Sequence, residues 1–352
     1  MKNIIAKLYK RNELKRDELI YLLENLNDFW KDKLFKLSQK AVIENYGRKI
    51  FLRGLLEFSN YCHNDCLYCG LRKSNTNVSR YRLSLNEIIN SFEIAAKLGY
   101  KTLVLQSGED KYFTDDRLIS IISQIKSRYT DVAVTLSIGE RSYQSYQKLF
   151  EAGADRYLLR HETVNDKQYN NFHPDMNFKN RVKCLINLDD IGYQTGAGFI
   201  VGLPGQTIES IADNLLFLKK HDLDMVGLGP LIPHPDTPLA GCSRGSVEMT
   251  LVCYALTRLL LPKTLIPATT ALNTLDERGW EKGIRAGANV VMPNLSPAKS
   301  RDKYEIYQNK GDTDVSMLKD IKKRIKKTGF EVDMGRGDSI KWLNQKRRKN
   351  NE

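Results

Sequence analysis

The sequence has no long run of apolar residues. No window reaches the roughly 18 consecutive apolar residues of a membrane-spanning helix, although 41% of the residues are hydrophobic, a proportion typical of globular proteins. The N-terminal stretch MKNIIAKLYKRNELKRDEL alternates charged and apolar residues, so it predicts an amphipathic helix and not a secretory signal. We therefore expect a cytoplasmic protein without a membrane partner.

Cysteine is scarce, and none occurs from residue 295 onward. In a reducing cytosol, clustered cysteines indicate metal binding or catalysis more often than disulfides. Three of the six are clustered as C-x3-C-x2-C, namely Cys62, Cys66 and Cys69. The other three, Cys184, Cys242 and Cys253, show no partner spacing and are predicted to be small buried side chains.

The net charge of +13 could suggest a nucleic-acid partner, but much of it lies at the C-terminus. From residue 319 onward, 12 Lys and Arg stand against 5 Asp and Glu, which accounts for seven of the thirteen charges. The main body has no RNA-binding signature and no basic face interleaved with aromatic residues. We expect a solvated basic tail and no nucleic-acid partner; a nucleic-acid surface is the alternative.

From about residue 49, short apolar segments alternate with amphipathic ones. The expected strands are 50–58, 102–106, 132–137, 156–159, 195–201, 225–228, 266–270 and 289–292, and the expected helices between them are 85–98, 115–127, 143–152, 178–191, 208–220, 250–260 and 276–286. Regular alternation predicts a parallel α/β sheet. With about eight units, closure into a (β/α)8 TIM barrel is the simplest arrangement, and an open doubly wound sheet is the alternative.

A recurring phrase supports the barrel: KLGYKT, EAGADRY, DIGYQT and RAGANVV each place a glycine where a helix ends, just before the next strand. We expect three parts, with N-terminal helices over 1–47, the barrel over 48–308 and a basic C-terminal extension over 309–352.

The three clustered cysteines could bind three irons of a cubane [4Fe–4S] cluster and leave the fourth iron open. Zinc is the weaker alternative, because it needs a fourth ligand at a suitable spacing and His63 is too close to Cys62. In a TIM barrel the chemistry lies at the C-terminal ends of the strands, where the sequence places polar loops such as QSGED, RHET and PHPDTPL. Arg160, at one such end, is costly to bury unless an anion meets it.

The motif CxxxCxΦC, with Tyr68 before the last cysteine, resembles that of the radical S-adenosylmethionine (SAM) superfamily. This resemblance implies that SAM binds the open iron and is reductively cleaved to a 5′-deoxyadenosyl radical. Longer stretches, EFSNYCHNDCLYCGLRKSN, YKTLVLQSGED, AGADRYLLRHET, TGAGFIVGLPGQT, LDMVGLGPLIPHPDTPLA and IPATTALNT, resemble the [FeFe]-hydrogenase maturation family HydE over residues 50–308. That family shares a clan with biotin synthase and methylornithine synthase.

The resemblance also implies roles for individual residues. Those implied for SAM are Tyr68, Ser107, Gly108 and Glu109 (the last three at its amino group), Ser137, Glu162 at the ribose hydroxyls and Arg181 at the carboxylate. Those implied for an internal substrate or anion cavity are Thr135, Arg160, Thr269, Thr270, Ala271, Met292, Tyr304 and Tyr307. Plainer alternatives are surface ion pairing for Glu162 and Arg181, and helix packing for the two tyrosines. We expect His234 to form a loop hydrogen bond, and His161 and His173 to be structural.

The family implies a role in assembling the diiron subsite of the hydrogenase active site with HydF and HydG. The implied substrate is a cysteine-bound iron–carbonyl–cyanide complex, a small organometallic or thiol-containing molecule, and the electron donor a ferredoxin or flavodoxin. Because no cysteine follows residue 295, we expect one cluster and no second, C-terminal one. The alternatives are a clan enzyme acting on an amino acid or another small molecule, and a non-catalytic iron–sulfur scaffold.

Overall fold

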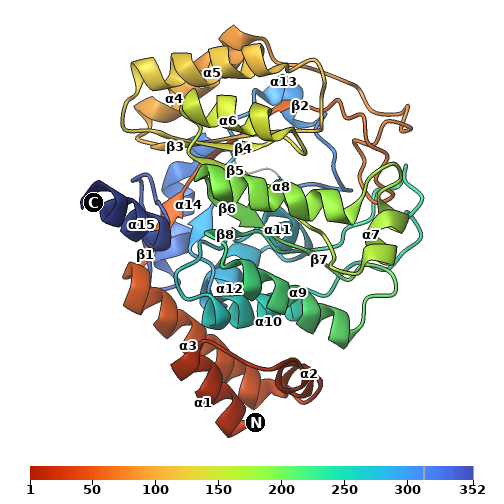
Figure 1. The fold of residues 1–352 in the computed structure, drawn as a ribbon, viewed down its shortest axis with the longest axis vertical. Helices are drawn as coiled ribbons and strands as arrows, with labels where there is room; N and C mark the ends of the chain where they lie inside the picture. The colour runs from red at the N-terminus through yellow and green to blue at the C-terminus, as the bar shows by residue number, and fades with distance from the viewer. Residues whose placement is uncertain (312–313, 352) are drawn as a thin grey trace.

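The structure is a computed structural model that describes residues 1–311 and 314–351, with side chains as far as Lys346. Its centre is a parallel sheet with the strand order β2-β3-β4-β5-β6-β8 (Figure 1). The strands are β1 (Lys49–Leu52), β2 (Gly54–Ser59), β3 (Thr102–Ser107), β4 (Ala133–Ser137), β5 (Arg156–Leu158), β6 (Gln194–Ala197), β7 (Ile200–Val201), β8 (Met225–Val226), β9 (Gly229–Pro230), β10 (Val290–Val291) and β11 (Glu331–Asp333).

Parallel bridges close this sheet into a barrel. Met225 of β8 pairs with Leu265, Pro267 pairs with Val290 of β10, and Asn294 pairs with Leu55 of β2. The six strands and these two further segments give eight parallel positions around the ring. The prediction of a (β/α)8 TIM barrel is confirmed, and the open doubly wound sheet is excluded.

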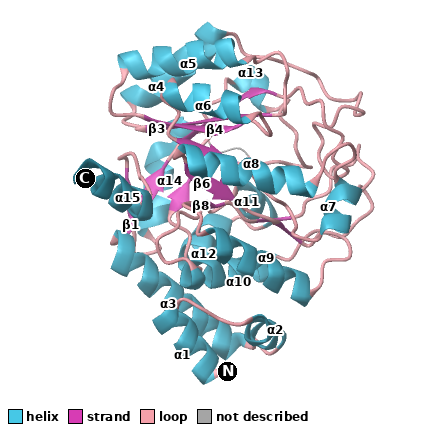
Figure 2. Ribbon diagram, in the orientation of Figure 1, coloured by secondary structure: helices cyan, strands magenta, loops and turns pink. Residues whose placement is uncertain are grey.

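Helices surround the strands on the outside (Figure 2). They are α1 (Lys2–Arg11), α2 (Arg16–Glu24), α3 (Asp28–Tyr46), α4 (Leu85–Lys97), α5 (Asp115–Arg128), α6 (Tyr143–Glu151), α7 (Asp166–Phe172), α8 (Phe178–Ile191), α9 (Ile208–His221), α10 (Val247–Leu260), α11 (Thr270–Leu275), α12 (Gly279–Arg285), α13 (Ala298–Arg301), the 3-10 turn η1 (Val315–Met317), α14 (Leu318–Lys326) and α15 (Ile340–Asn351). Within the described part of the chain, no helix combines the length and apolar character needed to cross a bilayer.

The glycines of the recurring phrase lie at the ends of helices, as the sequence predicted, and adopt a left-handed backbone conformation. Gly99, Gly153, Gly192 and Gly287 have φ values of 92°, 112°, 106° and 112°. A residue with a side chain rarely adopts this left-handed region. Each glycine therefore turns the chain sharply from the end of a helix toward the base of the next strand.

Two predicted elements differ from the observed ones around α11. The expected strand 266–270 is reduced to the bridges at Leu265 and Pro267, because proline has no N–H to donate to a ladder. The expected helix 276–286 is observed as α12 alone, and α11 precedes it from Thr270 to Leu275.

The two terminal segments pack against the barrel from outside. Helix α3 packs on α10, and α1 to α3 lie together at one end of the molecule in Figure 1. At the other terminus, β11 pairs in parallel with β1, and α14 buries Ile321 and Ile325. Part of the expected basic tail is thus packed and not simply solvated; the tail's side chains beyond Lys346 lie outside the described residues. The division at 47 and 308 stays a prediction.

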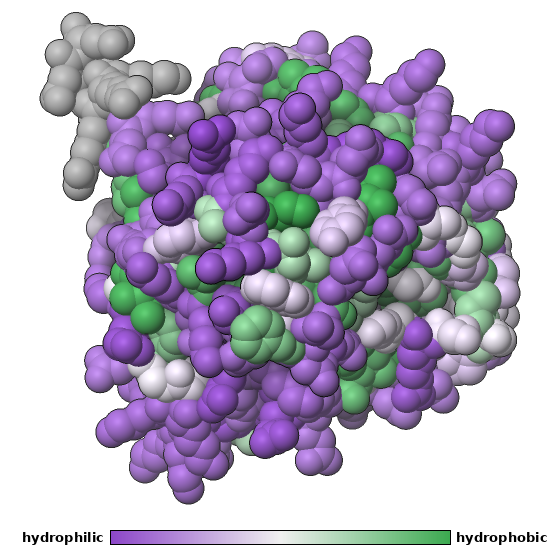
Figure 3. All heavy atoms as spheres, turned by 90° about the horizontal axis from the view of Figure 1, so that it is seen from below, coloured by the Kyte–Doolittle hydropathy of each residue, from purple (hydrophilic) through white to green (hydrophobic). Residues whose placement is uncertain are grey.

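The face of the molecule seen in Figure 3 is mostly hydrophilic, with apolar residues scattered between charged ones. Exposed large apolar side chains are likewise dispersed over the chain, for example Tyr21, Phe29, Ile94 and Ile186. The distinctive concave feature of the described structure lies instead inside the barrel.

Candidate active site

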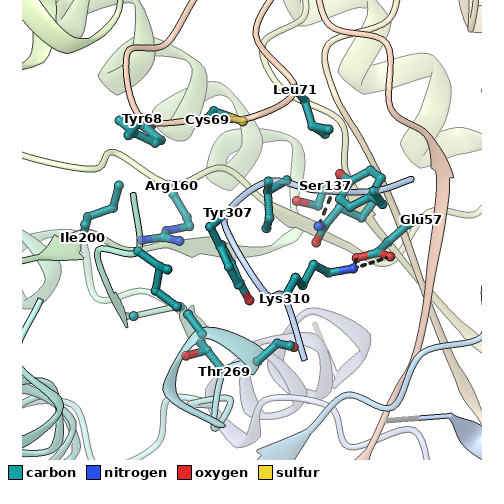
Figure 4. Close-up of a pocket in the computed structure, with 18 of the residues that line it drawn as sticks. Glu57, Tyr68, Cys69, Leu71, Ser137, Arg160, Ile200, Thr269, Tyr307 and Lys310 are labelled. Atoms are coloured by element: carbon teal, nitrogen blue, oxygen red, sulfur yellow. Dashed lines mark hydrogen bonds and ion pairs between the residues drawn. The ribbon is translucent and has the colours of Figure 1, made fainter. Parts of the chain in front are cut away.

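A cavity of about 340 Å³ opens at the C-terminal ends of the strands. Figure 4 shows it with Tyr68 and Cys69 at one end, Thr269 at the other, and Arg160 and Tyr307 between them. The predicted site residues that line it are Cys62, Cys66, Tyr68, Cys69, Ser107, Gly108, Ser137, Arg160, Glu162, Thr269, Thr270, Ala271, Met292, Tyr304 and Tyr307. Glu109, Arg181 and Thr135 are not part of that lining.

The loop that carries the three cysteines is fixed by backbone hydrogen bonds to its neighbours. The amide of His63 donates to the carbonyl of Glu109 over 3.1 Å, and that of Gly70 donates to the carbonyl of Ile306 over 3.0 Å. Gly108 passes so close beneath this loop that a Cβ there would lie 2.3 Å from the carbonyl oxygen of Tyr61. Glycine is thus required where the loop after β3 crosses the cysteine loop.

All three thiols are free and partly exposed, and they face the same cavity. Burial, together with the neighbouring Cys62, raises the pKa of Cys69 to about 12, so a metal must displace the thiol proton when it binds. Among the described residues no three ligating side chains are arranged around one metal ion. A cubane cluster does not need that arrangement, because each cysteine binds a different iron. The loop therefore fits a [4Fe–4S] cluster better than a single zinc ion.

Arg181, from the first turn of α8, is buried behind the cavity beside two carboxylates. Its Nε lies 2.8 Å from Glu140 and 2.9 Å from the hydroxyl of Tyr169, and an Nη lies 3.7 Å from Glu109. Burial acts to lower the pKa of Arg181, but Tyr169, Glu140 and Glu109 together raise it well above its usual value. Arg181 is therefore a fixed cation, and simple surface ion pairing is excluded.

Glu162 has an unusual backbone for a residue with a side chain. Its φ is 61°, and it is held by a parallel bridge to Phe199. Such conformations cost free energy and cluster at functional sites. The side chain lines the cavity, and its Oε2 lies 3.1 Å from an Nη of Arg160. Burial raises the pKa of Glu162.

Several buried polar atoms beside the cavity make no hydrogen bond with the described residues. They include Nε of Arg160 and the hydroxyl of Thr135, whereas one Nη of Arg160 and Oε2 of Glu162 contact only each other, as the ion pair at 3.1 Å. Thr135 lies two residues before Ser137 on β4, so both side chains face the barrel interior. Because buried polar groups are normally satisfied, this wall is built for a polar ligand.

The sequence did not indicate the charged pair Glu57 and Lys310, which also line the cavity. Nζ of Lys310 lies 2.7 Å from both carboxylate oxygens of Glu57 (Figure 4). Glu57 is fully buried on β2, and Asn294 donates to it over 3.0 Å. The only feature of the sequence that could have indicated this pair is an acidic residue, Glu57, within the largely apolar segment FLRGLLEF.

Tyr304 and Tyr307 lie in a non-helical segment, so helix packing is excluded for them. His234 accepts a hydrogen bond from the amide of Asp236 over 3.1 Å, as expected.

Two of the three cysteines outside the loop are buried, and so is His161. Cys184 and Cys253 are buried as predicted, but Cys242 is partly exposed, because it lies at the margin of a small apolar cluster on the loops above the strands. His161 is fully buried against Asn214, and burial lowers its pKa to about 3.

Comparisons with known proteins agree with this geometry. The family model of the radical SAM superfamily matches residues 56–218. The chain is 48% identical over 309 residues to the [FeFe] hydrogenase maturase subunit HydE of Thermotoga maritima, covering 88% of each chain. It is 29% identical over 330 residues to the 3-methylornithine synthase of Methanosarcina acetivorans, covering 92% of each.

Solved structures give the same result for the fold. The crystal structure of methylornithine synthase superimposes with a TM-score of 0.83 at 26% identity, over 94% of this chain and 97% of the other. A structure of HydG, a maturase of the [FeFe]-hydrogenase, gives 0.80 at 20% identity, over 95% and 76%, and supports the fold only. The superfamily implies a [4Fe–4S] cluster and SAM as cofactors. Sequence identity, fold and cysteine loop thus agree, and the chain belongs to the HydE family of [FeFe]-hydrogenase maturases within the radical SAM superfamily.

Proposed function

We propose that this chain acts in the assembly of the diiron subsite of [FeFe]-hydrogenase, on a small cysteine-bound iron–carbonyl–cyanide complex held inside the barrel. The observation that carries the proposal is the cavity beneath the cysteine loop, whose wall holds the ion pair of Arg160 and Glu162. Nε of Arg160 makes no hydrogen bond with the described residues. When bound, the cluster and SAM supply reductive cleavage of SAM to a 5′-deoxyadenosyl radical. The protein's own residues bind and orient the reactants.

On the cluster side, Cys62, Cys66 and Cys69 hold the cluster. Arg181, whose Nη lies 3.7 Å from Glu109, is the cation proposed to bind the SAM carboxylate, because its planar fork suits a carboxylate. Glu162 accepts hydrogen bonds from the ribose hydroxyls, which would satisfy its Oε2.

The other SAM contacts come from neighbouring strand ends. Backbone atoms of Ser107, Gly108 and Glu109 receive the amino group of SAM. Tyr68 and Ser137 also line the cavity and complete the proposed SAM site.

On the substrate side, Arg160 balances the negative charge of the complex, and Thr135, Thr269 and Thr270 offer hydroxyl groups. Tyr304, only 2% exposed, closes the wall together with Tyr307 and Met292, while Ala271 leaves room beside them. Exclusion of water protects a reactive intermediate from side reactions. This arrangement favours a small anionic substrate over a peptide or a nucleic acid.

We propose a single cluster, since the sequence has no cysteine from residue 295 onward. The proposed partners are HydF and HydG, with a ferredoxin or flavodoxin as electron donor. A reducing cytoplasm suits six cysteines that form no disulfide.

The first experiment is anaerobic reconstitution of the purified chain with iron and sulfide. We expect about four irons per chain and formation of 5′-deoxyadenosine when SAM and a reductant are added. Cys66→Ser should lose both, whereas Cys184→Ser, at a buried cysteine outside the loop, should retain both. Cleavage of SAM by the Cys66→Ser variant would contradict the cluster assignment.

The same preparations then test the specific function. An extract that lacks this protein should fail to produce active [FeFe]-hydrogenase and should recover when the protein is added. Arg160→Ala should lower maturation far more than SAM cleavage, and Arg160→Lys should restore part of it. If maturation does not depend on the protein although SAM is cleaved, the second candidate gains, a small-molecule reaction like that of methylornithine synthase, whose fold this chain shares with a TM-score of 0.83.

A further inference from the structure

His173 lies between the cysteine loop and Arg181, although its sequence context indicated only a structural residue. It directly follows α7, is 2% exposed and is surrounded by the side chains of Tyr68 and Tyr169. Tyr68 lines the cavity just before Cys69. His173 therefore contacts the SAM site from behind, without facing the cavity itself.

The hydrogen bonds of His173 define which ring nitrogen carries the proton. Nδ1 lies 2.7 Å from the carbonyl oxygen of Tyr169, and because a carbonyl only accepts, Nδ1 must donate. Nε2 of the neutral ring is then an acceptor, and the hydroxyl of Tyr68 donates to it over 2.8 Å. Burial lowers the pKa of His173 to about 4, which keeps the ring neutral. The Tyr68 hydroxyl is thus held in one direction.

The same histidine is connected to the opposite side of the SAM site. Its ring stacks on Tyr169, with centroids 4.2 Å apart and planes at 23°. The hydroxyl of Tyr169 accepts from Nε of Arg181 over 2.9 Å. A continuous chain of contacts thus joins Tyr68, His173, Tyr169 and Arg181.

The backbone reinforces this connection. The amide of Leu67, next to Tyr68, donates to the carbonyl of Phe172 over 2.9 Å. Lys73, further along the cysteine loop, forms an ion pair with Asp175 over 3.0 Å. The turn around His173 is therefore attached to the cysteine loop at three points, independently of any cluster.

We propose that His173 is a positioning residue that fixes Tyr68 and, through Tyr169, Arg181 in the geometry required for SAM before SAM binds. The inference rests on the proposed SAM site and adds a residue outside the cavity to it. Preorganisation of this kind raises affinity because less conformational freedom is lost on binding.

The test compares SAM dissociation constants of reconstituted protein without reductant. His173→Phe removes the acceptor of Tyr68, together with the Nδ1 bond to the Tyr169 carbonyl, and Tyr68→Phe removes the donor. Each should weaken SAM binding about fivefold to tenfold, as loss of the shared hydrogen bond predicts. The double variant should be no weaker than the single ones, because both remove the same interaction. His173→Gln, which keeps an acceptor, should recover part of the affinity.

Two control variants match these changes away from the site. Tyr193→Phe removes a buried tyrosine hydrogen bond of 2.8 Å to the carbonyl of Tyr146, and His221→Phe replaces a histidine packed on the ring of Phe217. Both should bind SAM like the wild type. Wild-type affinity in His173→Phe, or additive losses in the double variant, would overturn the inference; a wild type that binds no SAM would instead contradict the proposed function.

A second readout needs neither SAM nor cluster. In the cluster-free protein, hydrogen exchange of the peptide that contains the Leu67 amide should be faster in His173→Phe than in the wild type, and unchanged in His221→Phe. Unchanged exchange in His173→Phe would mean that the backbone bonds alone hold the loop, and the proposed positioning role would be rejected.

Discussion

At the scale of single residues, Lys310 offers a direct test of how charge is buried in the cavity. Only 9% of its side chain is exposed, and its partner Glu57 is fully buried. Removing one partner of a buried ion pair leaves the other charge uncompensated and costs about 3 kcal/mol. Lys310→Met should therefore lower the free energy of unfolding, measured by urea denaturation, by about that amount.

The double variant Glu57→Gln with Lys310→Met should recover part of this loss, because no buried charge remains. Lys36→Met is the matched control, since its pair with Asp32 is exposed and contributes little. An equal effect of Lys36→Met and Lys310→Met would show that burial of the pair does not determine its strength.

The sequence predicted site residues best where a motif named them and least where a contact joins distant positions. Cys62, Cys66 and Cys69 are close in the chain, so their spacing alone brought them together. Glu57 and Lys310 lie 253 residues apart, and no local pattern pairs them. The left-handed backbone of Glu162 was equally invisible, because glutamate does not favour it and the backbone partners that hold Glu162, Gly198 and Ile200, lie far along the chain.

At the scale of elements, the crossing of the cysteine loop over the loop after β3 predicts a specific effect of one methyl group. In Gly108→Ala the new Cβ would lie 2.3 Å from the Tyr61 carbonyl, which is backbone and cannot move alone. The cysteine loop must shift, so we expect less iron bound after reconstitution and less 5′-deoxyadenosine formed.

Gly241→Ala is the control for this prediction, because nothing lies within 4 Å of a Cβ there. It should bind iron and cleave SAM like the wild type. Full iron content in Gly108→Ala would show that the cysteine loop tolerates the shift and that the close crossing is not required.

Helices whose apolar residues recur at helical spacing were predicted closely, and those without such a pattern were missed. Helix α8 begins and ends where the sequence placed it, at residues 178 and 191, because an apolar stripe and a terminal glycine mark it. Helix α7 has the polar sequence DKQYNNF and no such stripe. It forms because Asn165 caps it and tertiary contacts hold Tyr169 and Phe172.

At the scale of the whole molecule, the C-terminal segment is part of the barrel's base and not an appendage. The strand β11 pairs with β1, and the segment after it brings Arg336 and Asp338 to Arg156 of β5. Arg156 is fully buried. The excess of Lys and Arg in this segment suggested a solvated basic tail. A count of charges cannot show that Arg336 and Asp338 pair with each other and that Asp338 also pairs with Arg156 inside the fold.

This arrangement predicts how stability depends on pH. Burial alone would raise the pKa of Asp338, but Arg156, Arg336 and Gln194 lower it below its ordinary value of 3.8. A carboxylate with a lowered pKa stabilises the fold fully above its unfolded pKa, and this contribution is lost as pH falls through the folded value. Asp338→Asn should thus be about 3 kcal/mol less stable than the wild type at neutral pH, and the difference should shrink below pH 3.8.

The measurement is the free energy of unfolding of both proteins over a pH series. Asp131→Asn, which removes an exposed pair with Lys101, is the control and should change little at any pH. A difference between the wild type and Asp338→Asn that stays constant as pH falls would mean that the loss comes from packing and not from charge. The base of the barrel would then depend on the shape of the C-terminal segment, and the buried Arg156 would draw its compensation from the neighbouring carbonyl of Arg336.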